Sequence, residues 1–449
     1  MTKSQKIQAA YDAGRNADCQ VCLTRRSLAL WNFVISKFGI FLGFVILGFG
    51  ISPARATDAK VGDQLPLWSE GHLDIHFINI GSGESSLIIM PDGTTLLVDA
   101  GDHGNKDAYH LATLPDGTRQ AGEWIARYVK RATKNAPGDA LNYVLVSHLH
   151  GDHLGSPKKH TPLAASGAYK RIGLTELAEH VSFEKILDRG WPDYDFPAPV
   201  KTGVVTNYRK FLDWQIANKG VKAERFNVGV NDQLVMRNNP AKYPNFEIRN
   251  LASNGVVWTG VGANTRNHLP DPKDVAKGAI IENNCSIAFR LSYGAFDYFS
   301  GGDLSVNGTD TGSVGDMWKD IERPVALVTG PVDVMKANHH AYYDANSAFF
   351  LKSLRPRVIV VATWFTSHVD LGTYRRMQSK AIWPGARDIF ITNQPEAMKL
   401  ASRLDPKGPP PGHVVIRVKP GGDEYYVYVL EETNESGRVK SVRGPYKSR

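Results

Sequence analysis

Cysteine is scarce in this chain of 449 residues, which contains only three. Cys19 and Cys22 lie in an N-terminal segment that we expect to be removed, so Cys285 is the single cysteine of the expected mature chain. One cysteine cannot form an intramolecular disulfide. The fold must therefore depend on its core and on any bound metal, even in an oxidising compartment.

Long apolar runs are lacking after residue 51. Residues 27–51 are mostly apolar; they follow the pair Arg25 and Arg26 and precede a small-residue sequence that ends at Ala56. This order is typical of a secretory signal peptide, and the arginine pair suggests twin-arginine export of a folded protein, with Sec export as the other route. We expect cleavage after Ala56 and a periplasmic or secreted product. An uncleaved membrane anchor is the alternative.

The chain beyond residue 56 has no strong excess of either charge. The whole sequence has a net charge of +8, but residues 1–56 hold seven Lys/Arg and two Asp/Glu, which leaves 46 against 43, or +3. A broad surface for polyanions is therefore not indicated. We expect no stable complex with nucleic acid, and contact with a membrane only through an uncleaved signal segment.

Strand and helix patterns alternate through the rest of the chain. Apolar residues at helical spacing predict helices at 122–133, 207–220 and 373–381. Alternating or continuous apolar runs predict strands at 72–81, 85–90, 94–101, 141–148, 246–252, 285–294, 296–303, 332–340, 357–363 and 388–392, and a hairpin at 412–430. This order indicates an α/β fold in which two sheets lie between helices, in one domain over residues 57–449.

Residues 148–153, at the end of a predicted strand, form a cluster of ligand-type side chains. The spacing of His148 and His150 can aim two imidazoles at one point, while Asp152 and His153 point to a neighbouring one. Imidazole and carboxylate are the ligands that zinc prefers, so a close pair of metal ions fits this arrangement. A solvated polar turn is the alternative, but imidazoles clustered without a compensating ion gain nothing.

The run at residues 148–153 also matches the HxHxDH signature of the metallo-β-lactamase superfamily. Residues 77–101 resemble the opening of the hydrolase domain of ComEC-type DNA-uptake proteins, residues 282–303 resemble its NNxS…GD hairpin, and residues 332–346 its LKxxHHGS segment. The resemblance covers about residues 73–430. It implies a four-layer αββα sandwich and a metallohydrolase.

The resemblance further implies a set of metal ligands. His148 and His150 would bind one metal, Asp152 and His153 the other, and Asp303 would bridge both. Either member of the doublet at residues 339 and 340 would complete the second site, and we favour His339. Asp99 would orient a ligand imidazole by accepting its other ring proton. The expected ligands are His148, His150, Asp152, His153, Asp303 and His339.

The sequence departs from the superfamily pattern at the first metal. Most members supply a third histidine before the strand that ends in "GD", but this chain has "ENNCS" at residues 282–286, as in the ComEC-type branch. Cys285 and His268 are the candidates to replace that histidine. We expect two zinc sites of which the first is weaker, with manganese as the alternative metal.

No GxSxG or other nucleophile motif is present, so the expected nucleophile is a metal-bound hydroxide. We expect Asp152, His340 and His368 to act in catalysis, with His413 as a further candidate proton donor. The favoured substrate is a phosphodiester, either a small molecule or nucleic acid. The alternatives are a β-lactam or lactone hydrolase and a metal-stabilised binding protein without turnover.

If residues 1–56 are a twin-arginine signal, replacing Arg25 and Arg26 together by lysine should leave precursor in the cytoplasm. The exported wild-type protein should begin near Thr57, because the small residues before it form the cleavage site. Cell fractionation and N-terminal sequencing measure both. Membrane-bound protein that begins at Met1 would show that the segment is an anchor.

Overall fold

The computed structural model describes residues 58–104, 107–306 and 314–449. The expected signal peptide and its cleavage site lie outside these residues, so both stay predictions. Within the described residues, no helix has the length and apolar character needed to cross a membrane.

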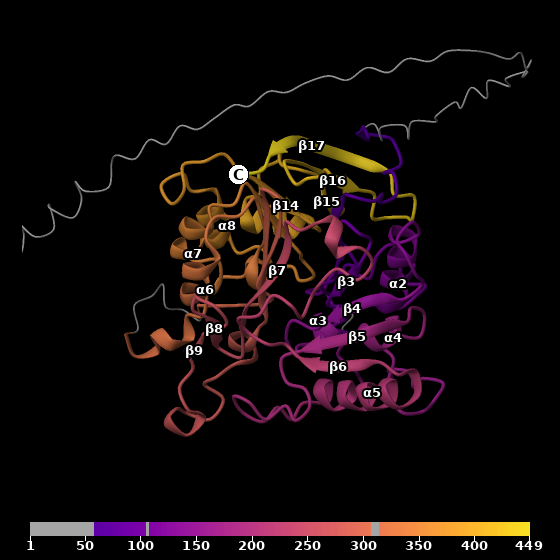
Figure 1. Cartoon of the computed structure of the whole chain (residues 1–449), viewed down its shortest axis with the longest axis vertical. Coiled ribbons are helices and arrows are strands. Elements are labelled where there is room, and N and C mark those ends of the chain that lie inside the picture. Colours follow the sequence, from indigo (N-terminus) through magenta and orange to yellow (C-terminus); the bar gives the residue numbers. More distant parts are fainter. Residues whose placement is uncertain (1–57, 105–106, 307–313) are drawn as a thin grey trace, which may run out of the picture. The chain divides into compact units, whose positions relative to one another are not determined.

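The described residues form two large sheets (Figure 1). In spatial order, the first sheet contains β17 (Val439–Lys447), β16 (Glu424–Leu430), β15 (His413–Val418), β1 (Leu73–Phe77), β2 (Ser86–Ile89), β3 (Thr95–Val98), β4 (Leu141–Leu145), β5 (Phe183–Asp188) and β6 (Lys222–Arg225). The second contains β14 (Asp388–Ile391), β13 (Val358–Val361), β12 (Val334–Lys336), β11 (Phe296–Ser300), β10 (Ala288–Tyr293), β7 (Phe246–Ser253), β8 (Val256–Trp258) and β9 (Thr265–Asn267).

Helices cover the outer face of each sheet (Figure 1). On the first sheet lie α2 (Ala121–Ala132), α4 (Leu174–Leu177) and α5 (Gly203–Lys219). On the second lie α6 (Glu322–Thr329), α7 (Ala348–Leu354), α8 (Leu371–Gln378) and α9 (Glu396–Ser402). The short α3 (Gly151–Leu154) belongs to the histidine loop.

Three apolar cores separate these layers. In β2, Leu87 and Ile89 pack toward the helices of the first sheet, whereas Ile88 packs between the sheets, as the two-residue period of a strand requires. Across the central core, the rings of Phe77 and Tyr298 meet edge to face at 6.2 Å. The layer order is therefore helix, sheet, sheet, helix, and the predicted four-layer α/β fold is confirmed.

The ends of α5 illustrate how local chemistry sets element bounds. The helix begins at Gly203, four residues before the predicted start, because the Thr202 side chain accepts a hydrogen bond from the Val205 N–H. It ends as predicted at Gly220, which adopts a φ of 69°. The apolar spacing predicted the middle of α5, whereas the capping Thr202 sets where the helix begins.

The parallel strands of the two sheets deliver their carboxyl ends to one region. β3 runs parallel to β4, and β11 runs parallel to β12. The segments that follow these strands carry Asp99, His148, Asp303 and His340. Open sheets of parallel strands place their sites beyond these ends.

Glu322, at the start of α6, ties that helix to the histidine doublet. One carboxylate oxygen accepts hydrogen bonds from Asn338 Nδ2 at 2.8 Å and the Asn346 N–H at 2.6 Å, and the other accepts the Ser347 N–H at 2.8 Å. The carboxylate is fully buried. Each oxygen thus faces donors only.

We expect Glu322→Gln to lower the free energy of unfolding by about 1–3 kcal/mol, because the new amide would set a donor against a buried N–H. Urea denaturation measures the loss. The matched control is Glu396→Gln on α9, whose side chain is 74% exposed and which should change stability by less than about 0.5 kcal/mol. Equal effects of the two substitutions would contradict the role of Glu322.

Candidate metal centre

Four buried side chains bring ligand-type atoms to one point. Nitrogen and oxygen atoms of Glu84, His153, Asp303 and His340 all lie within 4.8 Å of one another. Asp303 Oδ2 is 3.2 Å from His153 Nε2 and 3.2 Å from His340 Nε2. Asp152 Oδ2 approaches the same two nitrogens, at 3.4 Å and 3.1 Å. Asp152, His153, Asp303 and His340 therefore form a compact set, which we call the acidic histidine cluster.

The other two histidines of the 148–153 run lie beside this cluster. His148 Nε2 is 3.8 Å from Asp303 Oδ2, and it is 3.1 Å from His150 Nδ1. Burial, followed by the neighbouring His153, lowers the pKa of His148 well below its usual value. His148 is therefore a neutral imidazole, the form that binds metal ions. Asp303 stands between the two groups of histidines, the placement that a bridging ligand needs.

The residues present fit a metal ion. His153 Nε2 and Asp303 Oδ1 are buried and have no hydrogen-bond partner. Burial alone would raise the pKa of Asp303, but His153, His340 and His148 hold it well below its usual range. Imidazole nitrogens and carboxylate oxygens that converge in a buried space are the donor set of zinc. A cation would compensate the buried carboxylates and satisfy the unpartnered atoms.

Asp99 lies behind the cluster, where it fixes one imidazole. Its Oδ2 is 2.8 Å from His153 Nδ1 and accepts the hydroxyl of Ser147 at 2.7 Å, while its Oδ1 accepts the backbone N–H of Ser147 at 2.7 Å. The hydrogen bond at Nδ1 directs His153 Nε2 toward Asp303, as expected for an orienting residue.

The structure places the histidine doublet differently from our expectation. His340 reaches the acidic histidine cluster, whereas His339 Nδ1 pairs with Asp344 at 2.6 Å and its Nε2 lies 3.2 Å from Asn283 Nδ2. His339, His340 and Ala341 all have positive φ, between 45° and 57°. This strained turn sends adjacent side chains in different directions, so His340 replaces His339 as the candidate ligand.

Sequence analysis missed two charged residues that support the cluster. Glu84 Oε2 lies 3.2 Å from His340 Nδ1, and Glu84 Oε1 lies 3.0 Å from the buried Lys336 Nζ. Lys336 also donates to the carbonyl oxygen of Gly302 at 2.8 Å. The available signal was a charged residue within an otherwise apolar strand, β12, because a fully buried lysine needs a carboxylate partner.

The remaining predicted residues divide between the cluster and other places. His368 is buried and stacks on His340, with ring centres 4.6 Å apart. His413 Nδ1 instead accepts the Asn79 N–H, and its ring lies against Tyr128. Cys285 is buried, with its Sγ 3.8 Å from the Ile281 carbonyl oxygen, and His268 lies near Arg266. The structure therefore brings His368 to the cluster. Within the described residues, neither Cys285 nor His268 forms a hydrogen bond or an ion pair with a metal-ligand candidate.

Burial raises the pKa of the Cys285 thiol to about 12. The thiolate is the form that binds metal ions, so this cysteine is protonated and behaves as a core residue.

Glu282, near Cys285 in the chain, holds the histidine loop in place. Glu282 Oε1 accepts the Leu149 N–H at 2.8 Å, and the carboxylate forms a two-pronged pair with the buried Arg189. The Arg189–Glu282 pair thus holds the backbone between His148 and His150.

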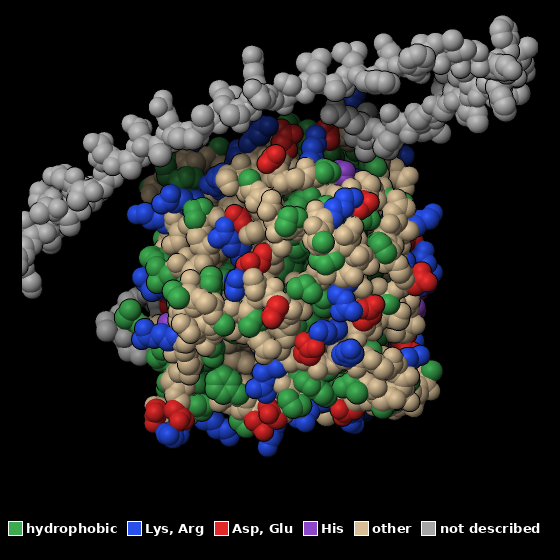
Figure 2. Space-filling model, viewed as in Figure 1, with side chains coloured by type: hydrophobic (Ala, Val, Ile, Leu, Met, Phe, Trp, Pro, Cys, Tyr) green, Lys and Arg blue, Asp and Glu red, His purple; other side chains and the backbone are tan. Residues whose placement is uncertain are grey.

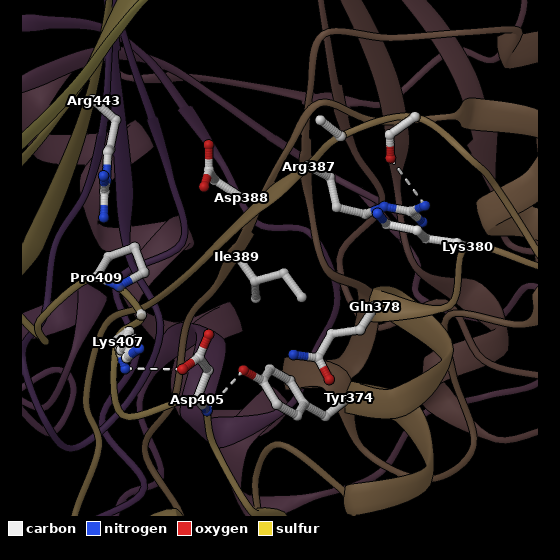
Figure 3. Close-up of a pocket in the computed structure, with 13 residues that line it drawn as sticks. Tyr374, Gln378, Lys380, Arg387, Asp388, Ile389, Asp405, Lys407, Pro409 and Arg443 are labelled. Atoms are coloured by element: carbon white, nitrogen blue, oxygen red, sulfur yellow. Dashed lines mark hydrogen bonds between the residues drawn. The ribbon is translucent and has the colours of Figure 1, made fainter.

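One further pocket lies at the opposite end of the parallel strands, where β14 begins (Figure 3). It measures about 390 Å³ and is lined by Asp388 and Arg387 among others. Asp388 accepts the Tyr446 hydroxyl at 2.5 Å, and Arg387 donates to the carbonyl oxygens of Met377 and Gly385. This pocket shares no lining residue with the acidic histidine cluster.

On the face of the molecule that Figure 2 shows, positively and negatively charged side chains are interspersed.

No protein-family model and no curated protein matches the chain. Among solved structures it is similar to the metallo-β-lactamase SMB-1 bound to 2-mercaptoethanesulfonate, with 12% identity, a TM-score of 0.30 and coverage of 60% of this chain and 78% of that one. It is also similar to a long-form RNase Z from yeast, with 12% identity, a TM-score of 0.27 and coverage of 65% and 37%. Likeness of this extent assigns neither family nor activity, and the four-layer arrangement rests on the sheets and helices of the chain itself.

We expect protein prepared without chelator to contain zinc or manganese, and His340→Ala to lose most of it, because His340 Nε2 points into the cluster. Elemental analysis of the folded variants measures the content. His339→Ala is the matched control and should keep its metal, since that ring pairs with Asp344. Loss of metal from His339→Ala alone would restore our original assignment.

Proposed function

We propose that the protein is a metal-dependent hydrolase that cleaves phosphodiesters outside the cytoplasm. The observation that carries the proposal is the convergence of Asp152, His153, Asp303 and His340 in a buried space, with His148 and His150 beside it. A zinc ion held by such ligands supplies an activated water near neutral pH and polarises the bond that is cleaved.

The residues of the chain have separate tasks in this proposal. Asp303 would join the two halves of the centre, because it lies between His148 and His153. Asp99 would keep His153 in one tautomer, and the Ala362 carbonyl oxygen, 3.1 Å from His340 Nδ1, would do the same for His340. His368, stacked on His340 and buried, is the candidate to exchange a proton with the leaving group.

Two features favour a phosphodiester over a β-lactam or a lactone. The resemblance of residues 77–101, 282–303 and 332–346 is to a ComEC-type hydrolase, and residues 282–286 contain no histidine where most of the superfamily has a third ligand of the first metal. The convergence of His153, Asp303 and His340, with Asp99 bound to His153, supports an enzyme over a binding protein without turnover. Hydrolysis of bis(p-nitrophenyl) phosphate, a β-lactam and a lactone by metal-replete protein separates these alternatives.

We expect Asp152→Ala to lower the rate of bis(p-nitrophenyl) phosphate hydrolysis by roughly 10²-fold or more, because it removes a negative ligand that lies within 3.4 Å of two cluster imidazoles. Cys285→Ala, a change at a buried residue outside the cluster, should reduce the rate far less. Steady-state kinetics with metal content measured on the same samples gives both numbers. A Cys285→Ala enzyme that loses both metal and activity would overturn our reading of the first site.

A further inference from the structure

A large pocket opens next to the histidine loop. It measures about 700 Å³, and His150 and Leu149 form part of its wall. The rest of the wall comes from residues 197–202, which precede α5, and from residues 272–285, which precede β10. His150 is the metal-ligand candidate that lines the pocket, and its Nδ1 lies 3.1 Å from His148 Nε2, so the pocket adjoins the candidate metal centre at this ring. Pockets of this volume hold small-molecule ligands.

The wall of the pocket is mainly aliphatic. Its apolar members include Pro197, Val200, Val275, Ile280 and Ile281, and no Phe, Tyr or Trp is among the described residues that line it. Nucleobases bind to proteins chiefly by stacking on aromatic rings. Aliphatic chains need only apolar surface, and each buried methylene adds binding free energy. The composition of the wall therefore favours a saturated chain over a base.

The charged residues of the pocket give it a positive rim. The guanidinium of Arg189 already has partners within the protein. It pairs with Glu282 and also donates to Asn254 Oδ1 and to the Phe196 carbonyl oxygen. Lys201 and Lys277 are exposed, and neither forms an ion pair with a described residue. Two such lysines suit an anionic group, and they oppose a cationic one.

We propose that this pocket holds the aliphatic chain of a chain-bearing phosphodiester whose phosphate lies at His150. The substrate class is thus an amphiphilic phosphate ester, with the anionic group between the cluster and the lysines and the chain along the aliphatic wall. The reaction rests on the proposed function, whereas the binding of the chain rests on the pocket alone. Arg189 supports the arrangement, since it joins the histidine loop through Glu282 to the wall at Phe196.

The experiment compares p-nitrophenyl alkyl phosphates with ethyl, butyl, hexyl and octyl chains as substrates of the metal-replete protein. We expect kcat/KM to rise about fourfold for each added methylene until the chain fills the pocket. The p-nitrophenyl ester of thymidine 5′-phosphate serves as the nucleotide comparison and should be a poorer substrate than the hexyl ester. In parallel, calorimetry with ethyl- and octylphosphonate measures the binding of the chain without turnover.

Val275→Asp places a charge on the aliphatic wall and should remove most of the chain-length dependence in both measurements. The matched control is Val261→Asp, at a valine that is 67% exposed and does not line the pocket; it should keep the dependence. Replacing Lys201 and Lys277 by alanine should weaken octylphosphonate binding by up to about fivefold for each lysine at low salt.

The outcomes separate the pocket from the reaction. If bis(p-nitrophenyl) phosphate is cleaved but neither kcat/KM nor phosphonate binding depends on chain length, the inference is wrong and the proposed function stands. If no phosphodiester is cleaved but octylphosphonate binds more tightly than ethylphosphonate, and Val275→Asp abolishes the difference, the pocket inference stands and the proposed function fails. A thymidine ester that is cleaved better than the hexyl ester would overturn the aliphatic assignment in favour of a nucleotide.

Discussion

Buried negative charge is the constraint on which the functional end of this molecule depends. Asp99, Asp303 and Glu84 are nearly inaccessible to water and lie within one small region together with several imidazoles. A buried carboxylate is costly unless opposite charge or hydrogen-bond donors compensate it. Lys336 supplies one fixed positive charge to Glu84, and Ser147 supplies donors to Asp99. For Asp303, a metal ion would supply the positive charge that the neighbouring residues do not provide.

The two-sheet scaffold makes this concentration of charge possible. The strands bury mainly apolar side chains on both faces, and the polar groups of the candidate centre follow the ends of β3, β4, β11 and β12. The apolar layers thus carry the stability of the sandwich. The strained turn at His339 and His340 is held from outside by Glu322, which binds the backbone of Asn346 and Ser347. Strain of this kind persists only where the surroundings impose it.

How much of the fold and of the candidate site could be predicted from the sequence depends on whether the residues that indicate each feature lie close together in the chain. The run from His148 to His153 could be recognised in the sequence. Ligand-type residues at short spacing on one loop can bind one ion in any fold that presents the loop, so the prediction needs no knowledge of the fold. Most strands were likewise visible as alternating or continuous apolar runs, but β5, β6, β8, β9 and β17 were not predicted. Shorter elements such as α7 and α9 carry too few residues for a clear period, and they form because they pack on the second sheet.

Other features depend on how residues are placed in three dimensions, and the sequence did not reveal them. The choice between His339 and His340 is set by backbone torsions at positive φ, which no residue type in the doublet predicts. Glu84 and Lys336 are 252 positions apart in the numbering, and they meet only because β11 and β12 lie in the sheet opposite the one that contains β2. A pairing of this range leaves no periodic trace in the chain.

The departure at residues 282–286 connects the metal centre with the pocket. This segment forms a short 3-10 helix, η3 (Glu282–Cys285). Asn283 of this helix contacts His339, and Glu282 holds Leu149 and Arg189, so the segment positions the histidine loop from outside instead of adding a ligand. The same Arg189 reaches Phe196, at the edge of the aliphatic wall. The buried Arg189–Glu282 pair therefore lies between the histidine loop and the aliphatic wall, and it shapes the space beside His150.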